Sequence, residues 1–160
     1  MTYGWAILII ALALGVLYSL GILNPGRLKP VMCLLPAPFS CNIQNFSTGG
    51  KLSITLSQGS GNTYTINRIA CVDNALLDTN GLPKSNSYWT TTATGLTLSV
   101  NPLPSGSTTT ASGIQCYTPN GPYSGGIGSS FGGTLVINYT LPSGAYAFTS
   151  GAINAQVNTQ

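Results

Sequence analysis

The chain has 160 residues, of which five are Lys or Arg, two are Asp or Glu and none is His. Charged residues make up 4% of it, against about 25% in a typical soluble domain. Without His, and with only Asp73 and Asp78 as carboxylates, the composition argues against a catalytic triad, a paired-carboxylate acid and base, or nitrogen ligands for a metal. We therefore expect no enzyme and no cofactor. A net charge of +3 on scattered basic residues also predicts no nucleic-acid surface.

The first predicted element is an apolar helix. Residues 3–23 contain no charged residue, Asn, Gln or Pro. A helix of this length would be about 30 Å long, enough to cross a bilayer. Asn24, Pro25 and Gly26 follow, and these residue types end helices. Beyond them the composition changes to short apolar runs separated by Gly, Pro, Ser and Asn, so we expect a division at about residue 25.

Three interpretations of this apolar helix compete. A secretory signal peptide is disfavoured, because no basic residue precedes the helix and no small-residue cleavage site follows Leu23. A permanent membrane anchor fits the length, but Arg27 and Lys29 would then lie on the exported side, against the positive-inside bias. The third interpretation is a helix that packs against copies of itself in a fibre, since an apolar helix without a polar stripe must be buried all round by lipid or by protein.

Small residues would let such helices approach closely. They fall on nearly one face of the predicted helix, at Gly4, Ala11, Gly15 and Ser19. The last three form a small-xxx-small pattern, which is typical of close helix packing. Tyr3 and Trp5 are either interfacial aromatic residues or packing groups in a filament core.

The first 25 residues resemble the N-terminal helix of archaeal type IV pilins, whose precursors are cut by a prepilin peptidase. The most specific part is the run YGWAILII at Tyr3 to Ile10, with a Tyr-x-Leu-Gly end before Asn-Pro. The loop between Cys33 and Cys41, a strand at 51–59 and Cys71 extend the resemblance to about residue 75. The family's basic leader is missing here, so the chain is expected to be mature or truncated. Trp5 replaces the Glu that many type IV pilins carry near position five, so no Glu-to-amine assembly contact is carried over.

From Lys51 onward, the chain is predicted to be β-sheet. Leu52, Ile54 and Leu56 alternate with polar residues, as in a strand with one buried face. Further candidate strands lie at 64–66, 96–100, 133–140, 145–149 and 152–157. Roughly seven or eight short strands favour an antiparallel sandwich, immunoglobulin-like in general architecture. The predicted fold class is thus α+β and pilin-like: a long hydrophobic helix (1–25), a neck with a short disulfide loop (26–50) and an all-β sandwich (51–160).

Four cysteines in a chain that looks exported predict two disulfides. Three pairings are possible. We favour Cys33–Cys41, a short loop that would brace the neck, and Cys71–Cys116 across the sheet. A zinc site is disfavoured because the cysteines lack C-x-x-C spacing and no His is present. Some cysteines could instead be buried apolar thiols.

Two glycosylation sequons begin at Asn45 and Asn138. Asn138 lies inside a predicted strand, where a glycan fits only if the side chain faces solvent. Asn45 lies in a predicted loop and is the better candidate. The glycine-rich segment 121–133 lacks the Lys and the helix of a phosphate-binding loop, so we expect a surface loop there. Its Tyr123 and Phe131 either pack within the domain or contact a neighbouring subunit or an adhesion target.

The resemblance implies a structural subunit of an extracellular surface filament. Its precursor would sit in the cell membrane, lose its leader to a prepilin peptidase and be lifted by an assembly ATPase and membrane platform into a helical polymer of identical subunits. The filament would serve adhesion. The alternatives are a monomeric membrane-anchored binding module of the cell envelope, for which the same helix would stay in lipid, and an archaellum filament subunit.

Overall fold

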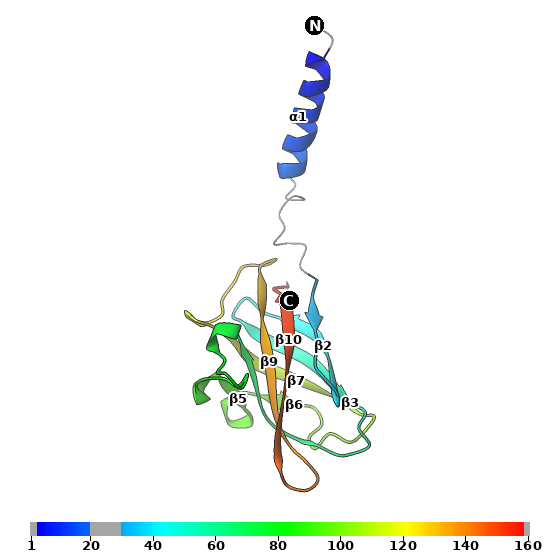
Figure 1. Cartoon of the computed structure of the whole chain (residues 1–160), viewed down its shortest axis with the longest axis vertical. Coiled ribbons are helices and arrows are strands. Elements are labelled where there is room, and N and C mark those ends of the chain that lie inside the picture. Colours follow the sequence, from blue (N-terminus) through cyan, green and yellow to red (C-terminus); the bar gives the residue numbers. More distant parts are fainter. Residues whose placement is uncertain (1–2, 20–29, 159–160) are drawn as a thin grey trace.

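The computed structural model describes residues 3–19 and 30–158 (Figure 1). It contains one α-helix, α1 (Gly4–Ser19), followed by strands and short 3-10 helices. The strands are β1 (Met32–Cys33), β2 (Phe39–Phe46), β3 (Lys51–Gln58), β4 (Thr65–Val72), β5 (Trp89–Thr91), β6 (Thr97–Leu98), β7 (Thr108–Thr118), β8 (Gly121–Pro122), β9 (Ser130–Thr140) and β10 (Tyr146–Gln156). The 3-10 helices are η2 (Asn74–Leu76), η3 (Asn86–Tyr88) and η4 (Thr92–Thr94).

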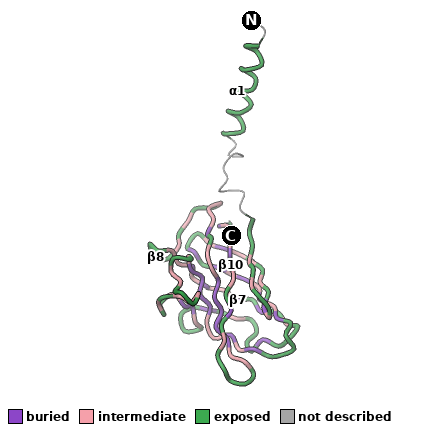
Figure 2. The backbone as a smooth tube through the Cα atoms, in the orientation of Figure 1, coloured by how far each residue is buried: buried purple, intermediate pink, exposed green. Residues whose placement is uncertain are grey.

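Helix α1 is apolar on every side, and none of its residues is buried. Figure 2 shows this as an uninterrupted exposed tube. The predicted helix continued to about residue 25, but positions 20–25 lie outside the described residues, as do Arg27 and Lys29. Within the described part of the chain, no helix has both the length and the apolar character needed to span a membrane.

The strands form one sheet in the order β1-β10-β9-β4-β7-β3-β2, with β5 beside β4 and with β6 and β8 beside β7. All pairs are antiparallel except β4 with β7. The end strands of this order, β1 and β2, are joined by the Cys33–Cys41 disulfide. The sheet therefore closes on itself into a barrel-like unit, hereafter the barrel (Figure 1).

The predicted fold class, a long helix followed by an immunoglobulin-like sandwich, is therefore wrong. The described helix is short, and one barrel-like sheet replaces two stacked sheets. The reason is the parallel pairing of β4 with β7 at Cys71–Cys116 and Val72–Tyr117, which joins strands that a sandwich would keep in separate layers. In both a sandwich and a barrel, every second side chain of a strand is buried. The alternation of apolar and polar residues in the sequence therefore could not distinguish the two architectures. The segment 26–50, expected as a neck, supplies β1 and β2 to the same sheet.

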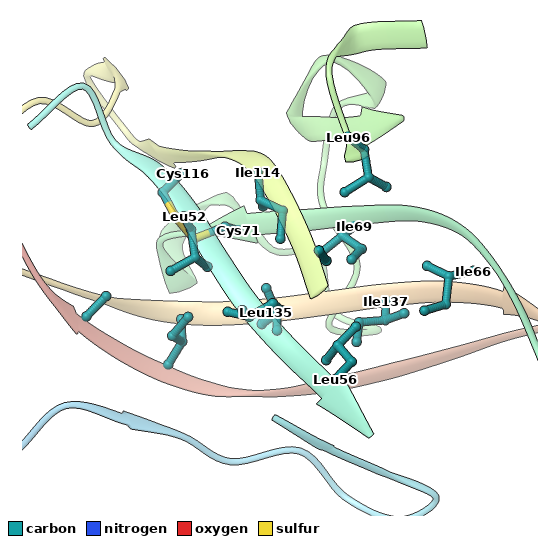
Figure 3. Packing of buried hydrophobic residues seen from close by; sticks show 14 of the residues in the cluster. Leu52, Leu56, Ile66, Ile69, Cys71, Leu96, Ile114, Cys116, Leu135 and Ile137 are labelled. Atoms are coloured by element: carbon teal, nitrogen blue, oxygen red, sulfur yellow. A yellow bond between two sulfur atoms is a disulfide. The ribbon is translucent and has the colours of Figure 1, made fainter. Parts of the chain in front are cut away.

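The main core fills the inside of the barrel. Most of its fully buried aliphatic residues come from β3, β4, β7 and β9, and Figure 3 shows several of them together with the Cys71–Cys116 bridge: Leu52, Leu56, Ile66, Ile69, Ile114, Leu135 and Ile137. Successive side chains of a strand point to opposite faces. The residues between them therefore point out of the barrel.

A second, smaller core lies on the outer face of β4 and β9. Ala70, Val72 and Val136 are buried there together with Trp89, and the segment that carries η2, η3 and β5 covers them. Partly buried side chains of this cover pack against the cluster, namely Leu76, Leu77, Leu82 and Tyr88, and Tyr117 of β7 joins them. Farther along β4, β9 and β10, the outward-facing Arg68, Tyr146 and Phe148 are partly or fully exposed, so the same outer face is not covered there.

Candidate functional site

Helix α1 carries a shallow apolar groove along one side. It is lined by Leu8, Ala11, Leu12, Gly15, Val16 and Ser19. The structure thus brings together three of the four small residues expected on one face, whereas Gly4 lies outside the groove. A Cβ atom added at Gly15 would meet nothing within 4 Å, so the space above it is open. The Ser19 hydroxyl donates to the Val16 carbonyl oxygen at 2.9 Å, which satisfies the donor of the groove's one polar side chain within the helix.

The two predicted aromatic packing groups at the start of the helix are open to solvent. Tyr3 and Trp5 are 81% and 79% exposed. Together with the groove, they leave α1 with a continuous apolar surface that no other described part of the chain covers. Apolar surface of this extent marks a site of contact with protein or lipid.

The predicted disulfides are confirmed: Cys33 is bonded to Cys41 and Cys71 to Cys116. All four cysteines are thereby used, which removes the alternatives of a zinc site and of buried thiols. The first bridge closes the barrel between its two end strands, and the second lies inside the core. Disulfides persist in oxidising compartments, so the chain is suited to an extracellular or secreted environment.

Asn138 lies in strand β9, as the sequence predicted, whereas Asn45 does not lie in the predicted loop. Asn45 is in strand β2, next to a β-bulge, and is half-buried instead of lying in a free loop. Asn138 is 4% exposed, and its Oδ1 accepts a hydrogen bond of 3.1 Å from Asn67 Nδ2. Asn67 Nδ2 also donates to Thr140 Oγ1 at 2.9 Å. Glycosylation at either position stays a prediction.

The glycine-rich segment carries packing groups. Tyr123 lies 5.2 Å from Phe46 and 5.4 Å from Phe131, measured between ring centroids. Its hydroxyl is 3.1 Å from Ser129 Oγ, to which it donates. Phe131 is part of the main core. Of the two roles left open for these rings, packing within the barrel is the one the structure supports.

Sequence reasoning missed a hollow on the outside of the barrel. It has a volume of about 350 Å³ and is lined by Asn67, Arg68, Asn138, Tyr146 and Phe148, a set called here the outer shelf. Arg68, Asn138 and Phe148 are direct cross-strand partners on β4, β9 and β10. Tyr146 and Phe148 are 74% and 44% exposed. The one sequence signal for this site is the pair of aromatic residues two apart on a strand, which does not reveal the partner strands.

The carboxylates of the chain lie away from this shelf and serve local turns. Asp73 accepts from the backbone N–H of Ala75 at 2.9 Å, at the start of η2. Asp78 accepts from the backbone N–H groups of Asn80 and Leu82 at 2.9 and 2.8 Å. Both therefore stabilise the cover over the smaller core.

Comparison with known proteins supplies no family: no protein-family model matches the chain, and no curated protein has significant similarity to it.

Proposed function

We propose that this chain is a structural subunit of an extracellular helical filament of the archaeal type IV pilus kind, in which identical subunits polymerise through the N-terminal helix. The observation that carries the proposal is the state of α1. It is apolar on all sides, and none of its residues is buried by another described part of the chain. Such a helix needs a partner surface, and copies of the same helix provide one.

The groove on α1 indicates how neighbouring helices would meet. Ala11, Gly15 and Ser19 lack bulky side chains, so a second backbone can approach there. Larger side chains that line the same groove, such as Leu8 and Leu12, would pack around the contact. Burying a whole apolar helix is worth on the order of tens of kcal/mol at about 25 cal/mol per Å², before the entropic terms that oppose association. A polymer held in this way resists dissociation.

The barrel suits the outer layer of such a filament. Two disulfides constrain it, and few of its residues are charged. In this proposal, a membrane platform and an assembly ATPase insert the subunit after a prepilin peptidase has removed a leader. The membrane holds the precursor only, and adhesion of the finished filament is its biological output.

The same exposed apolar helix also fits two rivals. In one, α1 stays in lipid and the barrel is a monomeric binding module of the cell envelope. In the other, the filament is an archaellum and serves motility. The first predicts a monomer that only detergent extracts, and the second predicts filaments whose loss abolishes swimming instead of attachment.

A pair of matched substitutions tests the role of the groove. Ala11→Leu places a large side chain in the groove, whereas Ala13→Leu makes the same change about 200° around the helix. Both variants are expressed in the producing cells, and fibres are sheared, pelleted and counted by electron microscopy. We expect Ala11→Leu to abolish fibres and Ala13→Leu to retain most of them. Equal fibre yields from the two variants would contradict packing through this groove.

A further inference from the structure

We propose that the outer shelf binds one sugar unit of an acidic polysaccharide, that is, a uronic acid or a sulfated sugar. The proposal rests on the described surface of the barrel and does not depend on filament formation. It assigns the shelf three kinds of contact: ring stacking, hydrogen bonds from side-chain amides, and a cation that faces the sugar's acidic group.

Cross-strand pairing holds the polar part of the shelf in one row. Arg68 is paired with Asn138, and Asn138 is paired with Phe148, so the three side chains stand side by side on neighbouring strands. The next outward row brings Thr140 opposite Tyr146. Strand pairs on both sides fix the backbone of β9, so Asn138 is held on a rigid support and not on a loop.

Arg68 gives the shelf its charge. Its guanidinium lies 4.4 Å from the ring centroid of Trp89, which is almost fully buried in the smaller core. This cation–π contact holds the guanidinium over the Trp89 ring. Within the described residues, no carboxylate approaches Arg68, because Asp73 and Asp78 bond to backbone N–H groups of their own turns. The five guanidinium N–H donors therefore favour acceptors from outside the chain, a carboxylate or sulfate best of all.

Asn138 supplies an amide donor to the hollow. Its Oδ1 is used by Asn67, while no hydrogen bond of its Nδ2 is found within the described residues. Among those residues, no fully buried polar side-chain atom lacks a hydrogen-bond partner. Asn138 is 4% exposed, and its Nδ2 atom is therefore partly accessible to solvent. This atom is reached through the hollow that Asn138 lines. A sugar hydroxyl there would accept its hydrogen bond.

Tyr146 and Phe148 complete the shelf with exposed rings. They are two residues apart on β10, so both point outward, and both line the hollow. Phe148 also lies 6.2 Å from Trp89, measured between ring centroids, which anchors one ring against the smaller core. Aromatic faces beside amide groups match a sugar ring, which has apolar C–H faces and a polar rim. The volume of about 350 Å³ lies within the range of small-ligand sites.

The test uses the full chain, solubilised as a monomer in detergent, and isothermal titration with three probes. These are tetragalacturonate, the neutral galactotetraose and inorganic sulfate. We expect tetragalacturonate to bind, galactotetraose to bind about ten- to a hundredfold more weakly, and sulfate alone to bind more weakly still. Because the monomer is used, failure of this proposal leaves the filament proposal intact, and the reverse also holds.

Matched variants locate the binding. Arg68→Gln should weaken tetragalacturonate binding about ten- to a hundredfold, whereas Lys51→Gln removes the same charge from an exposed position on β3 and should leave it unchanged. Tyr146→Ala changes a side chain that is 74% exposed, which the fold should tolerate, and should also weaken binding. Equal losses in Arg68→Gln and Lys51→Gln, absence of binding, or equal affinity for galactotetraose would overturn the proposal. So would a sugar covalently attached to Asn138 in mass spectra, since it would occupy the hollow.

Discussion

Two neighbouring glycines on β9 differ in what surrounds them. A Cβ atom at Gly133 would overlap the Val72 carbonyl oxygen of the adjoining strand β4, whereas one at Gly132 would meet nothing within 4 Å. Both residues lie in extended backbone, since neither has a positive φ angle. The requirement for glycine at Gly133 is therefore steric and comes from strand packing, not from backbone conformation.

This difference predicts opposite outcomes for the same substitution. Gly133→Ala should lower the free energy of unfolding by about 1–3 kcal/mol, because β4 and β9 must move apart to admit the methyl group. Gly132→Ala should be neutral or stabilising by up to about 1 kcal/mol, because it restricts the unfolded chain. Urea unfolding of both variants measures the two values. Similar losses at both positions would contradict the packing described here.

Tyr139 gives the barrel a defined response to alkali. It packs edge-on against Phe39 and Tyr64, with ring centroids 4.9 and 5.1 Å away. Burial raises the pKa of Tyr139 above its usual 10.0, and the neighbouring Tyr64 raises it further. Just above pH 10 the unfolded chain has thus lost a proton that the folded chain retains. Stability contributed by neutral Tyr139 is present below that pH and decreases as the pH rises through this window.

We therefore expect the free energy of unfolding to fall between pH 9 and pH 11. Tyr139→Phe keeps the ring but removes the titrating group, so this variant should lose less stability over the same interval. Urea unfolding at the two pH values gives both differences. An identical decrease in the variant would show that the alkaline response arises elsewhere.

The limits of sequence reasoning at this scale are clear from Asn138. The sequon was visible, but its accessibility depends on Asn67, which is 71 residues away along the chain. Arg68 and Trp89 likewise meet only through the pairing of β4 with β5. The outer shelf therefore could not be predicted. The small-residue groove could, because Ala11, Gly15 and Ser19 are local to one helix and helical spacing fixes their common face.

Among the elements, β3 was predictable from its large alternating side chains, whereas β2, which was expected as part of a neck, and β7 were not predicted. Leu52, Ile54 and Leu56 identified β3, and all three are fully buried. β7 was missed because its start is a Ser/Thr tract, in which Thr109 and Ala111 are the buried positions. Conversely, the expected strand at 96–100 is reduced to the two residues of β6.

The disulfides join different elements and should contribute unequally. Cys33–Cys41 spans 8 residues and Cys71–Cys116 spans 45. Loop-closure entropy then gives about 2.5 kcal/mol for the first bridge and about 4 kcal/mol for the second. The second also fills core volume that alanine would leave empty. We expect Cys71→Ala/Cys116→Ala to be clearly less stable than Cys33→Ala/Cys41→Ala in urea unfolding.

The shorter bridge should have a local effect that the longer one lacks. It joins the end strands β1 and β2, so its removal should increase hydrogen exchange in β1 and in the paired residues Ile153 and Asn154 of β10. The central pair of β4 and β9 should stay protected. Unchanged exchange at β1 in Cys33→Ala/Cys41→Ala would mean that the barrel closes without this covalent link.

On the scale of the whole molecule, the sequence predicted the division between an apolar helix and a β-rich part but not the architecture of the latter. The closed order of the sheet depends on strands distant in sequence, above all on β4 between β9 and β7. The alternation of apolar and polar residues along a strand specifies neither the order of the strands in the sheet nor their parallel pairing. The division matters for function, because no residue of α1 is buried by another described part of the chain, while the barrel buries its own core.

The claim that this helix is covered by copies of itself is tested most directly on fibres sheared from producing cells. Negative-stain electron microscopy would show whether fibres are present, and mass spectrometry of the purified fibres would identify their main protein. We predict fibres in which this chain is the major component, with peptides of α1 protected from protease until the fibres are dissociated. The claim is contradicted if the chain is absent from fibres and is recovered only from the membrane fraction as a detergent-extracted monomer.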